Sequence, residues 1–179
     1  VVATTLHQVL QRTFDDDRSG QTLVERIMSA GHKVARREIV KDEIHLIVTQ
    51  LRQWISAPDV DVIVATGGTG VTGRDVTPEA FRQVIEKEIP GFGELFRWLS
   101  YQKIKTSTVQ SRALAGVAEG KYLFALPGSP GVSGSASAFT AIFSRRGDRT
   151  IEASASGGSA AAAAASTAGA FGGGGGGRG

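Results

Sequence analysis

The sequence predicts an α/β fold, in which helices cover a buried sheet. The uninterrupted apolar run at residues 62–65 is typical of a central parallel strand with helices on both faces. A long apolar stripe at helical spacing precedes this run, and a glycine-rich turn and a second helix start follow it. This order of helix, strand, turn and helix indicates an α/β arrangement.

The elements before the central strand follow from apolar spacing and from chain-breaking residues. Residues 19–30 place apolar side chains at every third or fourth position, which predicts a helix that Gly31 ends. Residues 32–40 are rich in β-branched residues but interrupted by charges, so we expect a short or edge strand. A second helix extends from Asp42 toward Pro58, and Asp42 taken alone is interpreted as its N-cap.

The next helix begins at residues 77–79. Thr77 can accept a hydrogen bond from a first-turn amide. Pro78 has no N–H, but an N–H at this position would have no partner within the helix, and the charge of Glu79 suits the positive helix end. A further helix is expected at residues 93–101. Its Trp98, like Trp54 in the second helix, lies on an apolar stripe, so we expect both indoles in the core or at a subunit interface.

The last predicted element is a β-hairpin. Residues 113–118 and 121–126 are strand-like, and Glu119-Gly120 between them is a turn pair. The second strand ends in a loop of small residues, Pro127-Gly128-Ser129-Pro130-Gly131. Because open α/β sheets bind ligands at the carboxyl ends of their strands, this loop and the glycine-rich turn are the candidates for chemistry.

Composition restricts the function classes. The 179 residues suit one domain, expected over residues 1–156, whereas the Ala-, Gly- and Ser-rich residues 157–179 have little to bury and are expected to be disordered. The absence of cysteine excludes disulfides and thiolate metal sites and is compatible with a cytoplasmic location, which we expect. Scattered Lys and Arg, and the lack of an apolar run of about 18 residues, predict neither a nucleic-acid partner nor a membrane span.

The glycine-rich turn at residues 66–78 has two interpretations. Its glycines would let backbone amides approach anionic oxygens, but the spacing matches neither a P-loop nor a dinucleotide fingerprint, and a tight turn without ligand fits equally well. Asp75 favours the binding interpretation over that of a solvated loop aspartate. A carboxylate at the mouth of the loop could hold Mg²⁺ or orient an attacking group.

Five short motifs occur in an order that is specific to one family. They are Gly67-Gly68-Thr69-Gly70, Arg74-Asp75-Val76-Thr77-Pro78-Glu79, Pro90-Gly91-Phe92-Gly93-Glu94, Thr106-Ser107-Thr108 with Ser111-Arg112, and Leu126-Pro127-Gly128-Ser129-Pro130. In order and spacing they resemble the molybdopterin-binding family that includes MoaB, Mog and the corresponding domain of gephyrin. The resemblance covers roughly residues 13–131.

The resemblance implies a three-layer α/β/α sandwich with a mostly parallel central sheet, assembled as a homotrimer or a hexamer. Active members join the terminal phosphate of molybdopterin to AMP from ATP with Mg²⁺, before molybdate is inserted. The two aspartates that the family uses for catalysis and metal binding correspond to Asp42 and Asp75, and Asp42 can be an N-cap as well. The ligand-binding residues correspond to Gly67, Gly68, Thr69, Gly70, Pro127, Gly128 and Ser129.

Both ends depart from the family pattern. The family opens with a β-branched strand, whereas residues 1–11 break that pattern, so we expect the first strand to be lost unless Val9-Leu10 pairs as a short strand in its place. Such a member could bind molybdopterin or support the pathway without transferring AMP, and this is the alternative function. An enzyme of the neighbouring competence-damage type, acting on pyridine-nucleotide metabolites, is a third possibility that the absence of a second catalytic domain weakens.

Overall fold

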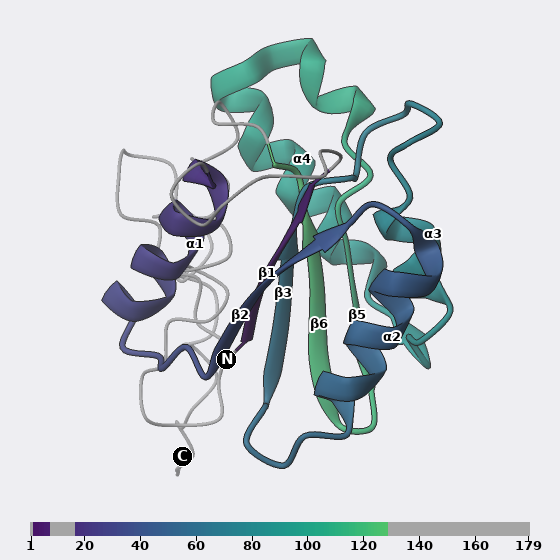
Figure 1. Ribbon diagram of the computed structural model, residues 1–179. Helices are drawn as coiled ribbons and strands as arrows, with labels where there is room; N and C mark the ends of the chain where they lie inside the picture. The colour runs from purple at the N-terminus through teal and green to yellow at the C-terminus, as the bar shows by residue number, and fades with distance from the viewer. Residues whose placement is uncertain (1, 8–16, 129–179) are drawn as a thin grey trace, which may run out of the picture.

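The computed structural model describes residues 2–7 and 17–128, which form one six-stranded mixed sheet with helices on both faces (Figure 1). The predicted α/β class is confirmed. The strands are β1 (Val2–His7), β2 (Arg36–Lys41), β3 (Val62–Thr66), β4 (Lys87–Glu88), β5 (Leu114–Ala118) and β6 (Lys121–Leu126). The helices are α1 (Arg18–Ser29), α2 (Ile44–Ile55), α3 (Thr77–Arg82), α4 (Pro90–Ile104) and the 3-10 helix η1 (Lys105–Gln110).

The sheet order is β2-β1-β3-β6-β5-β4. The four strands from β2 to β6 are mutually parallel, and β5 and β4 add two antiparallel pairings at the far edge. The predicted hairpin and the predicted edge position of β2 are both confirmed. The hairpin's turn residues Glu119 and Gly120 have φ angles of 47° and 74°, and positive φ at both positions is what a two-residue hairpin turn of type I′ requires.

The predicted loss of the first strand is wrong. Strand β1 pairs along its whole length with β2, from Val2 opposite Arg36 to His7 opposite Lys41, and also pairs with β3. It lies between two parallel neighbours, so its main-chain groups have partners on both sides. The predictions for Val9-Leu10 and for the tail at residues 157–179 fall outside the described residues.

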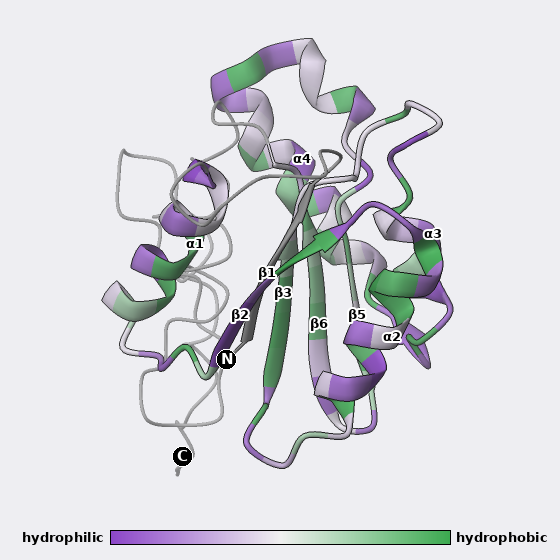
Figure 2. Ribbon diagram, in the orientation of Figure 1, coloured by the Kyte–Doolittle hydropathy of each residue, from purple (hydrophilic) through white to green (hydrophobic). Residues whose placement is uncertain are grey.

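Two apolar cores lie on opposite faces of the sheet, because alternate strand residues point to opposite faces. On one face Ile63 packs in a cluster with α2 and α3, and on the other face Val64 packs in a cluster with α1 and α4. Figure 2 shows β3 and β6 as the hydrophobic centre between these layers. Trp54 is buried as predicted, whereas Trp98 is 62% exposed and therefore lies outside the core.

The strand order reverses beside β1. The chain leaves β1 through α1 to reach β2, and then returns through α2, on the other face of the sheet, to reach β3 on the far side of β1 (Figure 1). Such a reversal is a topological switch point, and ligands of open α/β sheets bind outside the carboxyl ends of the strands there. Among the described helices, none is both long enough and apolar enough to cross a membrane.

Candidate functional site

Two glycine loops meet at the carboxyl ends of β3 and β6. The first loop comprises residues 67–76, and the described part of the second loop comprises Pro127 and Gly128. The Gly67 amide donates to the Leu126 carbonyl at 2.8 Å, and the Thr66 hydroxyl donates to the Pro127 carbonyl at 3.2 Å. A Cβ atom on Gly128 would lie only 3.0 Å from Cα of Gly67. The two loops predicted to bind ligand therefore lie edge to edge, while Ser129 falls outside the described residues.

Thr77 closes the first loop. Its buried hydroxyl donates to the Gly67 carbonyl at 2.9 Å, and its amide donates to the Gly68 carbonyl at 3.0 Å. The N-cap position of α3 belongs to Val76, so the predicted N-cap role of Thr77 is wrong. The hydroxyl instead gives a buried carbonyl of the tight turn a hydrogen-bond partner.

Asp42 reaches the first loop from β2, across the end of β1. A Cβ atom on Gly68 would lie 2.8 Å from Oδ1 of Asp42, so the carboxylate lies directly against this glycine. Gly68 also has a φ of 61°, a backbone conformation that residues other than glycine rarely adopt. The N-cap position of α2 belongs to Glu43, so the N-cap interpretation of Asp42 is wrong and its carboxylate faces the loop.

Asp75 lies at the other end of the same loop. Its Oδ2 accepts hydrogen bonds from the Thr72 amide at 2.9 Å and from the Thr72 hydroxyl at 2.6 Å, and it would lie 2.7 Å from a Cβ on Gly70. Burial raises the pKa of Asp75, but hydrogen bonds from Thr72 and Gly70 and the charge of Arg112 outweigh it and leave the pKa below its usual range. Asp75 is therefore an anion at neutral pH.

The two acids share one short segment of main chain. Asp42 lies against Gly68 and Asp75 against Gly70. With consecutive Cα atoms 3.80 Å apart, the Cα atoms of these two glycines are separated by at most about 7.6 Å. In residues 2–7 and 17–128, no group of three or more His, Asp or Glu side chains forms a metal cluster. A pair of carboxylates fits Mg²⁺, which proteins commonly hold through one or two carboxylates together with substrate phosphates.

Arg112 is a site residue to which the sequence analysis assigned no role. Its Nε donates to the Gly70 carbonyl at 2.6 Å, its Nη2 donates to the Asp75 carbonyl at 2.5 Å, and its Nη1 forms an ion pair with Glu79. Its own amide donates to the Thr69 carbonyl at 3.1 Å. The contacts join segments far apart in the chain, so local patterns could not predict them, and the Ser111-Arg112 motif was the one available signal.

The comparisons with known proteins show the family to which the chain belongs. The family described as "Probable molybdopterin binding domain" matches residues 4–145. The chain is 47% identical to molybdenum cofactor biosynthesis protein B of Escherichia coli K12 over 119 aligned residues. The aligned residues make up 66% of this chain and 70% of that protein. A crystal structure of molybdenum cofactor biosynthesis protein B superposes with a TM-score of 0.70 at 44% identity, covering 76% of this chain and 85% of the other.

A second solved structure extends the same relationship. The molybdopterin biosynthesis enzyme MoaB from Thermus thermophilus superposes with a TM-score of 0.66 at 33% identity, covering 75% of this chain and 85% of that one. The family match begins at residue 4 and so includes most of β1, the strand that the motifs alone did not predict. Sequence and fold lead to one conclusion: this chain belongs to the MoaB family of proteins with a molybdopterin-binding domain.

Proposed function

We propose that this protein binds molybdopterin and transfers AMP to it from ATP with Mg²⁺, as a step of molybdenum cofactor biosynthesis. The observation that carries the proposal is the pair of carboxylates, Asp42 and Asp75, against Gly68 and Gly70 of one loop. That loop follows β3 at the switch point of the sheet, and the second loop lies against it. Acids beside two glycine loops suit a reaction between phosphates.

The loops supply the binding surface. Their glycines let phosphate and pterin oxygens approach main-chain N–H groups closely, since no Cβ stands between them. Gly67 and Gly68 both have positive φ angles, 109° and 61°, so the main chain there follows a path that few other residues could adopt. Thr77 and Arg112 hold this path in place through hydrogen bonds to its carbonyls. A preformed loop binds a phosphate without a further cost of ordering.

The reaction needs no general base. An oxygen of the terminal molybdopterin phosphate attacks the α-phosphorus of ATP, the bond between that phosphorus and the bridging oxygen breaks, and pyrophosphate leaves with the electron pair. The attacking phosphate is largely dianionic at neutral pH, since its second pKa is about 6. The acids therefore bind and position the reactants, and the low pKa of Asp75 suits that role. When bound, Mg²⁺ offsets the negative charge that the phosphates and the two carboxylates bring together.

Incubation with molybdopterin, ATP and Mg²⁺ tests the proposal, with adenylylated pterin and pyrophosphate measured separately from pterin binding. Asp75→Asn and Asp42→Asn should each lower turnover by at least about 100-fold and leave molybdopterin bound. Asp59→Asn is the control and should keep its turnover. Asp59 precedes β3 and pairs with Arg36 at the start of β2, so it lies at the opposite end of the sheet. Bound pterin without product in the wild type would support the non-catalytic alternative, and absence of pterin binding would eliminate both functions.

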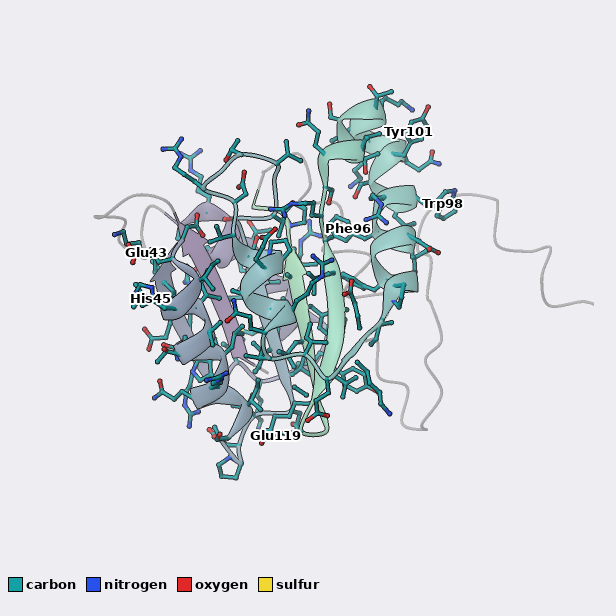
Figure 3. All side chains as sticks on the ribbon, turned by 90° about the vertical axis from the view of Figure 1, so that its right-hand side faces the viewer. Glu43, His45, Phe96, Trp98, Tyr101 and Glu119 are labelled. Carbon is teal, nitrogen blue, oxygen red and sulfur yellow. The ribbon has the colours of Figure 1, made fainter. Side chains whose placement is uncertain are left out.

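We also propose that the chain assembles as a homotrimer or a hexamer. Exposed apolar side chains on α4 and η1 support this proposal, since solvated surfaces seldom keep several large ones together. Figure 3 shows Trp98 projecting outward from α4, whereas Phe96 of the same helix lies on the side of the sheet. The exposed apolar residues of this surface are Leu95, Trp98, Tyr101 and Val109.

A further inference from the structure

We propose that Arg112 is a positioning residue for the AMP transfer, which holds the first loop so that Asp75 keeps its place. The inference rests on the proposed function for its catalytic consequence. Arg112 lies just before β5 and outside both glycine loops, yet its side chain and its amide bind the beginning and the end of the first loop.

We call the contacts of Arg112 with Thr69, Gly70, Asp75 and Glu79 the Arg112 brace. Its amide and Nε bind the carbonyls of Thr69 and Gly70, where the loop begins. Its Nη2 binds the carbonyl of Asp75 itself, and its Nη1 pairs with Glu79 in the first turn of α3. One side chain therefore connects the glycine turn, the peptide of the proposed catalytic aspartate and the helix that follows. The side chain is 31% exposed, so these bonds are partly shielded from water.

Two sets of bonds together place the Asp75 carboxylate. Thr72 holds the carboxylate oxygen through two hydrogen bonds, and Arg112 holds the main chain of the same residue. Thr72 belongs to the same loop, so its bonds do not connect Asp75 to the rest of the protein. Arg112 supplies that anchor, because its main chain leads directly into the buried strand β5.

Only arginine can make this brace. The guanidinium presents its N–H groups in a rigid planar fork, which allows one side chain to bind three separated acceptors, whereas a lysine ammonium is a single point on a flexible stem. Three of its N–H groups bind protein acceptors, so in this proposal Arg112 acts by holding the loop. Its loss should therefore lower turnover more than it weakens substrate binding.

The test compares Arg112→Ala and Arg112→Lys with the wild-type protein. Because a misplacement of about 1 Å can lower a rate 100-fold, Arg112→Ala should lower kcat by roughly that factor, with the molybdopterin Kd changed less than about fivefold. Added guanidinium ion at concentrations far below denaturing should restore part of kcat in Arg112→Ala, and Arg112→Lys should stay impaired. Arg36→Ala is the control, since Arg36 also binds a carboxylate, that of Asp59, but at the opposite end of the sheet.

Amide hydrogen exchange gives a readout that does not depend on activity. The amides of Thr72 and Asp75 are hydrogen-bonded within the loop, so loosening the brace should raise their exchange rates by about tenfold or more. The same amides should be unaffected in Arg36→Ala. A wild type that transfers no AMP would refute the proposed function. The amide exchange rates alone would then show whether Arg112 holds the first loop in place. Unchanged exchange at both amides in Arg112→Ala, or a wild-type kcat in that variant, would overturn the inference.

Discussion

The Asp42 carboxylate rests against Gly68, so closely that a Cβ on this glycine would lie 2.8 Å from Oδ1 of the acid. The same Cβ would overlap the hydroxyl of Thr77, which closes the first loop. One hydrogen atom in place of a methyl group therefore permits two contacts at once. The glycine lets a residue after β2 share a site with the loop after β3, although β1 separates the two strands.

Gly68→Ala should disrupt this arrangement. The new methyl group must displace Asp42 or Thr77, and the residue must also hold a φ of 61°, so we expect a loss of about 2–4 kcal/mol in the free energy of unfolding. AMP transfer should fall at least about 100-fold, as expected for a misplaced catalytic group. Gly31→Ala separates the two causes, because Gly31 has a φ of 82° but nothing within 4 Å of its Cβ position. That variant should lose stability and keep its turnover.

The low pKa of Asp75 predicts a pH dependence. Its folded pKa lies below the ordinary aspartate value of about 3.9, so the ionised form stabilises the fold above that pH, and this contribution is lost as the pH falls through the folded pKa. Thr72→Val removes the hydroxyl bond at 2.6 Å and should raise the pKa of Asp75. The acid limb of the kcat/KM profile should then move to higher pH. Thr49→Val, which removes an exposed hydroxyl bond on α2, should leave the profile in place.

The junction of α4 and η1 contains a strained residue. Lys105 has φ 52° and ψ −135°, a region that glycine adopts far more readily than other residues. Lys105→Gly relieves this strain but loses a contact of the ammonium with the Tyr101 ring, so we expect a net stabilisation of about 0.5–1 kcal/mol in urea unfolding. Lys103→Gly lies within α4 and should instead destabilise by about 1 kcal/mol. A destabilised Lys105→Gly protein would contradict the strain argument.

The exposed aromatic surface of α4 predicts a change in assembly. Trp98 is 62% exposed and Tyr101 is 48% exposed, and burial of both in a subunit contact would remove them from water. Trp98→Glu should therefore shift the mass in sedimentation velocity toward the monomer without lowering the Tm of the monomer core. Met28→Glu is the control and should leave the mass unchanged, because Met28 is similarly exposed, at 61%, but lies on α1. Equal masses for the wild type and for Trp98→Glu would exclude α4 as the contact.

Local sequence signals predicted most of the fold. The apolar run before Thr66 became the central strand β3, and the turn pair Glu119-Gly120 joined the predicted hairpin. These elements depend on hydrogen bonds and side-chain alternation among near neighbours, which the sequence displays directly. Strand β1 was missed because its place depends on pairing with β2 and β3, and both strands are distant in the chain.

The sequence by itself also determined which loops are the candidates for the site, since glycines after a buried strand must form a tight turn and the motifs resemble one family. Only the tertiary structure decided how that site is built. The Thr77 hydroxyl closes the loop instead of capping a helix, Asp42 meets Gly68, and Arg112 braces Asp75. The Asp42 and Arg112 contacts join residues that the chain separates and that the order of the strands brings together, whereas Thr77 bonds within its own loop. Strand order follows from the packing of the whole sheet, so no local pattern of residues could contain it.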